Sequence, residues 1–428
     1  MAKSSMAQMP ADTGLRRQAG RGLWLLGPAL VAGVAYLDPG NVAANMTAGA
    51  RFGYLLVWVV VLANVMAWLI QYLSAKLGLV TGMSLPEILG ARLSHPWARR
   101  AYWLQAELVA MATDVAEVIG GAVALNLLFG VPLVWGGVLT GVVSMGLLVV
   151  QTRHGARSFE TLIVALMVLI TAGFTAGVIV APPSVGGVAR GLVPRFEGTD
   201  SVLLAASILG ATVMPHAIYS HGALARDRFP HTARGLDGGP STLTLVRVAR
   251  WDVSVAMLVA GTVNLAMLVL AAANLTGVAG TDSLHGAHAA LREGLGPMVA
   301  ALFAVGLLAS GLASTSVGAY AGAEIMSGLL RLRLPIVMRR LITLAPALVV
   351  LAAGIDPTTA LVLSQVVLSF GIPFALVPLI ILTARRGVMG KYINRLATTW
   401  LGGISAGLLV ALNVALLWLT FAPDMTST

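Results

Sequence analysis

The stretch Ala35-Tyr36-Leu37-Asp38-Pro39-Gly40-Asn41 interrupts an apolar run that begins near Leu23. Asp38 places a carboxylate at membrane depth, Pro39 removes a backbone N–H donor, and Gly40 frees the backbone from helical geometry. Each of these residues would be a fault in a plain membrane-spanning helix. Together they predict a helix that is broken around a buried carboxylate.

A second interrupted run, from Val202 to Leu224, contains the stretch Ala211-Thr212-Val213-Met214-Pro215-His216. When Pro39 is aligned with Pro215, Asp38 aligns with Met214, and the alanines three residues before them also align. Two broken helices at matching positions of two halves predict a transporter with an inverted repeat and a binding site near the bilayer midplane. The alternative is a pair of ordinary proline kinks, which membrane helices tolerate. Such kinks require neither the acid nor the methionine.

The composition is that of a multi-spanning membrane protein. Of the 428 residues, 58% are hydrophobic and 10% are charged, and the mean hydropathy is +0.89. These values exclude a soluble domain. The chain has no cysteine, which excludes disulfides and thiolate metal sites. It has no HExxH, phosphate-loop or GxSxG motif either, so the sequence predicts a protein that is not an enzyme.

Apolar runs of spanning length predict an all-α integral membrane protein with about eleven transmembrane helices, since about 20 residues cross the hydrocarbon. The runs occupy residues 23–48, 54–80, 102–129, 131–151, 159–181, 202–225, 250–275, 297–330, 338–354, 357–383 and 397–421. We therefore predict a cytoplasmic tail over 1–22, a first half of five spans over 23–181, a second half of five over 202–383, and an eleventh span over 397–421.

The basic residues predict the orientation of these spans. All but four of the 27 Lys and Arg residues fall on one side, and the exceptions are Arg51, Arg190, Arg195 and Arg292. Because cytoplasmic loops are enriched in Lys and Arg, we expect the N-terminus inside and the C-terminus outside the cytoplasmic membrane. The net charge of +10 is then a topology signal, and we expect no nucleic-acid partner.

Several donors at the two breaks could bind a metal ion. Asp38 is an intramembrane acid, and such residues by default mark an ion or proton pathway. Asn41 adds an amide oxygen, Met214 adds a thioether, and the breaks could free the carbonyls of Ala35 and Ala211. A thioether offers little to Na⁺, Mg²⁺ or Ca²⁺ and favours softer ions such as Mn²⁺, Fe²⁺ or Cd²⁺. Taken alone, Met214 could equally be a core residue.

The third span carries three acids, Glu107, Asp114 and Glu117, at spacings of seven and three residues. On an α-helix they share an arc of about 80°. Three carboxylates on one stripe cannot all face lipid, so they require water, protons, metal or basic partners. Arg339 and Arg340, at the start of the ninth span, are candidate partners. A purely structural ion-pair network is the alternative.

Two histidines follow the second break, and histidine is the side chain that titrates most readily near neutral pH. His216 and His221 are therefore candidates for proton transfer. Five residues apart on a helix, they diverge by about 140°, which disfavours a shared metal. His221 could equally be a buried, hydrogen-bonded side chain. Gln365, a polar residue in the apolar tenth span, could be an additional ligand or form an interhelical hydrogen bond.

At these residues the sequence resembles the Nramp family of proton-coupled divalent metal transporters, most closely its bacterial manganese-uptake members. The resemblance rests on Asp38-Pro39-Gly40-Asn41 and Met214-Pro215-His216. The third-span acids support it, as do Gln365-Val366 and Gly371-Ile372-Pro373-Phe374. It extends from about Leu23 to Phe421.

The resemblance implies a LeuT-like fold with a 5+5 inverted repeat and with spans one and six broken. It implies the metal ligands Asp38, Asn41, Met214, Ala35, Ala211 and Gln365. It implies that His216, Glu107, Asp114, Glu117, Arg339 and Arg340 belong to the proton route and its polar network. The transported Mn²⁺ or Fe²⁺, with Cd²⁺ tolerated, would be a substrate and not a cofactor, and protons would be the coupling ion. No obligate protein partner beyond the lipid bilayer is expected.

Three other functions remain open from the sequence. A carrier of an organic solute such as an amino acid could use the same fold, although Asp38 would repel a substrate carboxylate. A channel or a non-transporting metal sensor would lack coupled flux. A membrane enzyme would need a nucleophile and a base, which the sequence does not supply.

Overall fold

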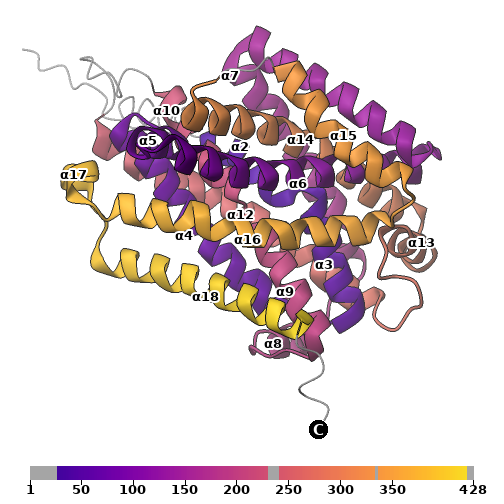
Figure 1. The fold of residues 1–428 in the computed structure, drawn as a ribbon. Helices are drawn as coiled ribbons and strands as arrows, with labels where there is room; N and C mark the ends of the chain where they lie inside the picture. Colours follow the sequence, from indigo (N-terminus) through magenta and orange to yellow (C-terminus); the bar gives the residue numbers. More distant parts are fainter. Residues whose placement is uncertain (1–26, 230–240, 333–335, 422–428) are drawn as a thin grey trace, which may run out of the picture.

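The computed structural model describes residues 27–229, 241–332 and 336–421, without the side chains of residues 148–160, 336, 337, 340, 420 and 421. Every regular element in these ranges is a helix. The predicted N-terminal tail and most of the loop between the sixth and seventh spans lie outside the described residues. Figure 1 shows a bundle of long helices with short helices at its edges.

The helices fall into two sets along the chain. Those up to the middle are α2 (Pro28–Val34), η1 (Ala35–Leu37), α3 (Pro39–Phe52), α4 (Val57–Thr81), α5 (Leu85–Arg92), α6 (Pro96–Phe129), α7 (Leu133–Val180) and α8 (Val185–Gly191). Those that follow are α9 (Gly198–Thr212), α10 (Pro215–Arg228), α12 (Thr242–Asn274), α13 (Leu284–Leu295), α14 (Pro297–Leu330), α15 (Ile336–Ala352), α16 (Pro357–Thr383), α17 (Arg386–Met389), η2 (Gly390–Tyr392) and α18 (Leu396–Phe421).

The apolar helices coincide with the predicted spans. Eight segments of the described residues are long and apolar enough to cross a membrane, and three shorter apolar helices join them. The short ones, residues 28–37, 133–147 and 341–352, fall on the predicted first, fourth and ninth spans. The prediction of an all-α membrane protein with about eleven spans agrees with this arrangement.

The connection between the fourth and fifth spans differs from the prediction. Residues 152–158 were expected to form a loop, but α7 is a single helix from Leu133 to Val180. Its 48 residues would extend for about 72 Å at 1.5 Å each, more than twice the hydrocarbon thickness. No proline occurs between these residues, so the backbone has no obligatory breaking point. The short polar stretch between the two apolar runs, which suggested a loop, does not by itself end a helix.

Both predicted breaks are present, and proline explains their geometry. Asp38 (φ −68°, ψ 163°) and Met214 (φ −65°, ψ 123°) have extended backbone, and Pro39 and Pro215 begin the next helices. The proline ring disfavours helical geometry in the residue before it and is well suited to the first helical position. Each X-Pro pair therefore ends one half-helix and begins another.

The broken sixth span lies at the centre of the bundle. Across its window in the range Gly198–Arg228, 94% of the residues are buried, against 33% in the last span. The first half-span, α2, lies against α10, α12 and α7, and α3 lies against α12, α9 and α16. In Figure 1, α18 lies at the edge of the molecule beside α16. The two breaks are therefore enclosed by other helices.

The small residues of α14 permit close approach of α6 and α7. A Cβ on Gly311 would lie 3.1 Å from the Glu117 carbonyl oxygen, and one on Gly318 would lie 3.0 Å from Glu117 Oε1. A Cβ on Gly306 would lie 3.3 Å from the Phe174 ring. This stripe is a packing surface, as small residues at membrane helix interfaces commonly are. It also leaves space for the acids of α6.

Candidate functional site

The break in the first span is organised by the Asp38 carboxylate, which is 0% exposed. Its Oδ1 accepts hydrogen bonds from Asn41 N (2.9 Å) and Asn41 Nδ2 (2.9 Å). Its Oδ2 accepts from Gly40 N (3.2 Å). Asp38 is thus the N-cap of α3, where the helix dipole and free N–H groups favour negative charge. The local sequence therefore holds a buried carboxylate in place through the backbone and side chain of its own helix.

Asn41 joins the first break to the second. Its Nδ2 also donates to the Ala211 carbonyl (2.8 Å), and its Oδ1 accepts from Thr212 Oγ1 (3.2 Å). Because α9 ends at Thr212, the carbonyls of its last turn lack the N–H partners that a continuing helix would supply. Because Pro215, four residues on, has no N–H, the Ala211 carbonyl accepts a hydrogen bond from the Asn41 amide instead of a helical N–H. Its predicted role as a metal ligand stays a prediction.

Gln365 reaches the same carboxylate from α16. Its Nε2 donates to Asp38 Oδ2 (3.3 Å), while its Oε1 is buried without a hydrogen-bond partner among the described residues. Gly40 and Gly210 make this approach possible. A Cβ on Gly40 would lie 1.7 Å from Gln365 Nε2, and one on Gly210 would lie 1.9 Å from the Gln365 carbonyl oxygen.

Met214 and Ala35 are also fully buried, at 0% exposure. Met214 is the residue between α9 and α10 and follows Thr212, which bonds to Asn41. Ala35 begins the single turn η1. In this structure the η1 carbonyls that accept side-chain hydrogen bonds are those of Tyr36, from Asn264 Nδ2 (3.0 Å), and Leu37, from Ser310 Oγ.

The donor set at the breaks has one acid. Among the residues that the structure describes, no group of three or more His, Asp or Glu side chains could hold a metal ion. At the breaks the structure places the Asp38 carboxylate beside neutral donors, the Asn41 amide and the Ala211 carbonyl. That Met214 adds a thioether ligand, which would favour softer ions, stays a prediction.

Glu107 of α6 is paired with Arg339 of α15, as the sequence suggested. Arg339 Nη2 lies 3.0 Å from Glu107 Oε1, and both side chains are nearly inaccessible. A Cβ on Gly322 of α14 would lie 1.7 Å from Arg339 Nη2, so the guanidinium occupies the space that this glycine leaves. The side chain of Arg340 lies outside the described residues, and its predicted role stays a prediction.

Asp114 and Glu117 are buried on the same helix, two and three turns from Glu107. One turn beyond Glu117, Gly120 lies against the first break, since a Cβ there would be 2.0 Å from Pro39 Cβ. The acidic stripe of α6 therefore extends from the Arg339 pair to the helix surface that contacts the Asp38 break. The structure brings these three acids onto one buried path.

The two histidines point to different neighbours. His216 Nδ1 lies 3.3 Å from Thr113 Oγ1 of α6, and its Nε2 is buried with no hydrogen-bond partner in the described part of the chain. His221 Nδ1 lies 2.6 Å from Gln71 Oε1 of α4, and Gln71 Nε2 is hydrogen-bonded to the Tyr36 hydroxyl. This agrees with the predicted divergence. Through Gln71, His221 of α10 is linked to α4 and η1. This contact agrees with the alternative that His221 is a buried, hydrogen-bonded side chain.

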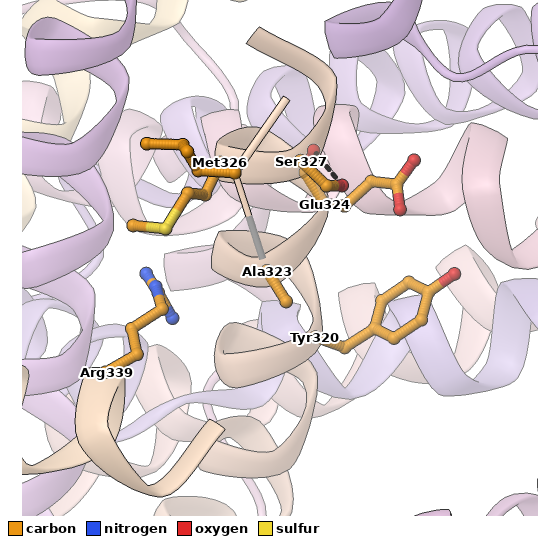
Figure 2. A pocket seen from close by; sticks show the side chains of 7 residues that line it. Tyr320, Ala323, Glu324, Met326, Ser327 and Arg339 are labelled. Carbon is orange, nitrogen blue, oxygen red and sulfur yellow. Dashed lines mark hydrogen bonds between the residues drawn. The ribbon is translucent and has the colours of Figure 1, made fainter. Parts of the chain in front are cut away.

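A cavity of about 310 Å³ opens between α14 and α15, near the Glu107–Arg339 pair. Its lining includes Arg339 of α15 and Tyr320, Ala323, Glu324 and Met326 of α14. In Figure 2, Arg339 lies on the same side of the α14 helix as Met326, whereas the Tyr320 and Glu324 side chains extend from its other side. Space of this size holds several waters, since one occupies about 30 Å³ of liquid. The Glu107 end of the acidic stripe of α6 is therefore next to a polar cavity.

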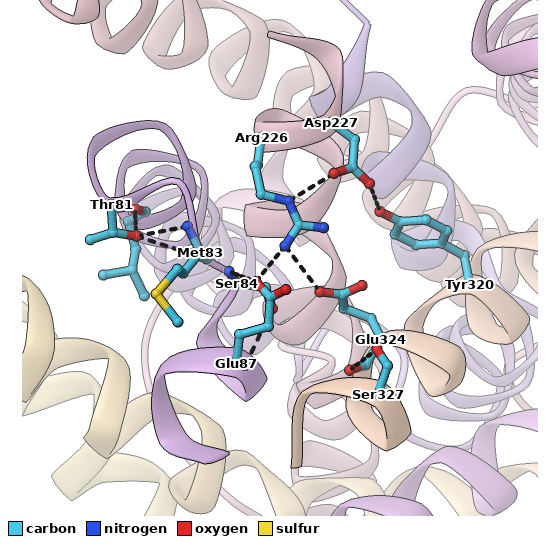
Figure 3. A network of polar contacts seen from close by, with 10 residues as sticks. Thr81, Met83, Ser84, Glu87, Arg226, Asp227, Tyr320, Glu324 and Ser327 are labelled. Atoms are coloured by element: carbon cyan, nitrogen blue, oxygen red, sulfur yellow. Dashed lines mark hydrogen bonds and ion pairs between the residues drawn. The ribbon is translucent and has the colours of Figure 1, made fainter. Parts of the chain in front are cut away.

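A network around Arg226, shown in Figure 3, was not predicted from the sequence. Arg226 Nη1 pairs with Glu87 of α5 and lies 3.5 Å from Glu324 Oε1 of α14, and its Nε lies 2.7 Å from Asp227 Oδ1. The Tyr320 hydroxyl donates to Asp227 Oδ2 (2.7 Å). The network joins the end of α10 to α5 and α14.

Sequence reasoning also missed the neutral polar partners of the predicted residues. Thr113, Thr212, Gln71, Asn264 and Ser310 are all buried and bond to the breaks or to the histidines. One signal was available, because polar residues inside an apolar span usually find partners within the bundle. The identity of each partner was not available from the sequence.

The sequence of this chain is similar to those of known metal transporters. A family model described as "Natural resistance-associated macrophage protein-like" (Nramp) matches residues 29–419. The divalent metal cation transporter MntH of Mycobacterium tuberculosis is 59% identical over 417 residues, which cover 97% of this chain and 96% of that protein. The protein of the same name from Bacillus subtilis is 46% identical over 402 residues, 92% of each chain.

Solved structures agree with the fold. A manganese transporter of Eremococcus coleocola, in complex with an aromatic bis-isothiourea substituted compound, is 30% identical with a TM-score of 0.83. That match covers 99% of this chain and 92% of the other. MhsT in complex with L-phenylalanine, at 14% identity and a TM-score of 0.58 over 92% and 97% of the chains, shares the fold alone. The predicted LeuT-like architecture is confirmed, and the chain belongs to the Nramp family of metal ion transporters, which are not enzymes.

Proposed function

We propose that this protein imports divalent transition-metal ions, Mn²⁺ and also Fe²⁺, with Cd²⁺ tolerated, across the cytoplasmic membrane together with protons. The observation that carries the proposal is the buried Asp38 carboxylate at the meeting point of two broken helices. It is hydrogen-bonded to Asn41 and Gln365, and Asn41 reaches Ala211 of the second break. The metal is cargo and not a resident cofactor.

The proposed ligands are Asp38, Asn41, Met214, the carbonyls of Ala35 and Ala211, and, in some states, Gln365. The hydrogen bonds around Asp38 suggest how binding proceeds. A cation at Asp38 must displace Asn41 Nδ2 and Gln365 Nε2 from the carboxylate, because these donors occupy both oxygens. Turning either amide offers its oxygen to the ion instead. Met214 then favours softer ions over Ca²⁺.

Coupling to protons follows from competition at one carboxylate. Only deprotonated Asp38 binds a cation well, so a proton and a metal ion exclude each other there. His216, with its unpaired buried Nε2, and the α6 acids Asp114, Glu117 and Glu107 would carry protons away by a separate route ending near Arg339. His221 and Arg340 would support this route. Alternating access would then arise from rocking of the broken spans about the fixed site.

We further propose the topology in the membrane. The first half would comprise residues 23–181 and the second 202–383, with an N-terminus in the cytoplasm and a C-terminus outside. The distribution of Lys and Arg supports this orientation. Apart from metal ions, protons and the bilayer, we propose no obligate partner.

The test is metal uptake into proteoliposomes under an imposed pH gradient, with Mn²⁺, Cd²⁺ and Ca²⁺ compared between the wild type and Met214→Ala. We expect metal-linked proton entry for the wild type and weaker discrimination against Ca²⁺ for the variant. Met167→Ala, at a buried methionine of α7, which is not one of the broken spans, is the matched control. Indifference of both proteins to Mn²⁺ and Cd²⁺ would refute metal transport, and saturable amino-acid uptake unaffected by Met214→Ala would favour an organic solute instead.

A further inference from the structure

A second cavity, of about 440 Å³, lies away from the metal site, between α4, α12 and the connection from α16 to α18. Its lining includes Trp68, Tyr72 and Lys76 of α4, Arg250 of α12, and Tyr392 and Arg395 of the connection. Figure 1 shows α17 of this connection at one edge of the molecule. The cavity thus combines three cations with three aromatic side chains, and nothing in the proposed transport mechanism uses it.

The aromatic and basic side chains form an ordered arrangement. Trp68 and Tyr72 stack with their ring centroids 6.3 Å apart and their planes 14° apart. The Arg250 guanidinium carbon lies 5.8 Å from the Trp68 ring centroid, and Lys76 Nζ lies 6.0 Å from that of Tyr72. Trp68 Nε1 donates to Ser254 Oγ of α12 (2.9 Å), which fixes the indole. Cations held over aromatic faces in this way remain available to an anion on their other side.

The described residues place no acidic side chain against the positive charge of the cavity. Within the described ranges, no carboxylate lies in ion-pair distance of Lys76, Arg250 or Arg395, whereas Arg226 and Arg339 both have acidic partners. Lys76 is only 6% exposed, and its Nζ donates to the neutral Asn394 Oδ1 (2.8 Å). A buried cation without a counter-charge is costly. The cavity therefore favours an anionic ligand.

The surroundings indicate a ligand with apolar chains. Leu243, Ile393 and Leu401 line the same cavity and are 55%, 40% and 56% exposed. Lys76, Arg250 and Arg395 lie near the ends of their spans, on the side where most Lys and Arg residues gather. Trp and Tyr are enriched at the level of lipid headgroups, and basic pockets between membrane helices on the cytoplasmic side bind anionic headgroups.

We propose that this cavity binds an anionic phospholipid of the leaflet on the basic side. Its phosphate would lie among Lys76, Arg250 and Arg395, and its acyl chains would lie along Leu243 and Leu401. The lipid would join α4 and α12 to the α16–α18 connection. At this place the Lys76–Asn394 hydrogen bond already joins α4 to the connection. Bound lipid therefore stabilises the folded transporter.

The test uses the full chain, purified in detergent and stripped of lipid. Its thermal unfolding is measured with phosphatidylglycerol, with phosphatidylcholine and with inorganic phosphate, and bound lipid is counted by native mass spectrometry. The Arg250→Gln, Arg395→Gln double variant keeps the buried Lys76 and so avoids disturbing its packing. Arg92→Gln with Arg100→Gln, two exposed arginines outside the cavity, removes the same charge and is the control.

For the wild type and the control we expect phosphatidylglycerol, but not phosphatidylcholine or inorganic phosphate, to raise the midpoint temperature. For the cavity variant we expect its apparent affinity to fall at least about tenfold, since each basic residue near an anionic lipid contributes about fivefold. Equal stabilisation by phosphatidylcholine would overturn the proposal. So would an equal effect of inorganic phosphate, or an equal loss in the control variant.

Discussion

Gln365 Nε2 of α16 donates a hydrogen bond to Asp38 Oδ2 at 3.3 Å, although 327 residues separate the two in the chain. Gln365 Oε1 has no hydrogen-bond partner in the described part of the molecule. The amide therefore covers the carboxylate with its donor and retains an unused acceptor beside it. A cation at Asp38 would turn the amide around, because it repels the N–H groups of Gln365 Nε2 and attracts Gln365 Oε1.

This relationship predicts the effect of Gln365→Leu. The variant loses one hydrogen bond but also removes the unpaired oxygen, so its stability should change by no more than about 1 kcal/mol. Mn²⁺ uptake should fall several-fold because an oxygen donor is missing. Initial uptake rates in proteoliposomes and thermal unfolding of the same preparation measure the two effects. An uptake curve identical to that of the wild type would remove Gln365 from the ligand set.

Replacement of the carboxylate itself should be more severe. In Asp38→Asn, Mn²⁺ binding should weaken at least about tenfold, because interactions with a charged group contribute about 1.5–3 kcal/mol. The new amide nitrogen would also meet donors from Gly40 and Asn41. Isothermal titration with Mn²⁺ measures the loss, and Asp200→Asn, an exposed acid paired with Arg51, is the control. Normal transport by the Asp38 variant would exclude competition between metal and proton at this residue.

The Glu107–Arg339 pair should contribute to stability in a strongly non-additive way. Removing one partner, in Glu107→Gln or Arg339→Gln, leaves a buried charge without compensation and should cost about 3–5 kcal/mol. The double variant should be more stable than the sum of the single losses predicts, because no unpaired charge remains. Thermal unfolding of the four proteins gives the coupling energy. Strictly additive losses would mean that the 3.0 Å contact is not an energetic pair.

The same pair can be disturbed without changing either charge. In Gly322→Ala the new Cβ would lie 1.7 Å from Arg339 Nη2, so the guanidinium must move away from Glu107. We expect lower stability and slower metal-linked proton entry. Gly407→Ala on α18, where nothing lies within 4 Å of the Cβ, should be neutral or slightly stabilising. Equal behaviour of the two alanine variants would show that the arginine relocates without consequence.

His285, in the connecting helix α13 outside the spans, should make stability depend on pH. Burial lowers the pKa of His285, and Asp356 offsets this only in part. The unfolded chain then binds more protons between the folded pKa and about 6.5, so stability rises with pH in this window. It falls on acidification below about 6.5.

The variant His285→Gln places an amide nitrogen near the position of Nε2, so it can still donate to Asn126 Oδ1, and it does not titrate. Its midpoint temperature, followed by thermal unfolding from pH 7.5 to pH 5, should fall less than that of the wild type. Parallel curves would assign the acid sensitivity to other groups.

The extent of sequence-based prediction differs between the fold and the site. Pro39 and Pro215 fixed the positions of both breaks, because a missing N–H and a ring clash act within one or two residues. The prediction of a loop near residue 155 was wrong, since a short polar stretch between apolar runs does not by itself end a helix and α7 continues through it. The Glu107–Arg339 pair was suggested by the excess of acids on one buried stripe.

What the sequence by itself determined is therefore local in origin: the apolar spans, the two broken helices, the capping of α3 by Asp38, and the uneven distribution of basic residues. Only the tertiary structure decided that Gln365 covers Asp38, that Asn41 reaches Ala211, and that Arg226 joins Glu87 to Glu324. The physical reason is the distance along the chain over which each effect acts. Helix breaking and hydropathy act along a few neighbouring residues, whereas a buried polar group takes its partner from whichever helix the packing of the whole bundle places beside it.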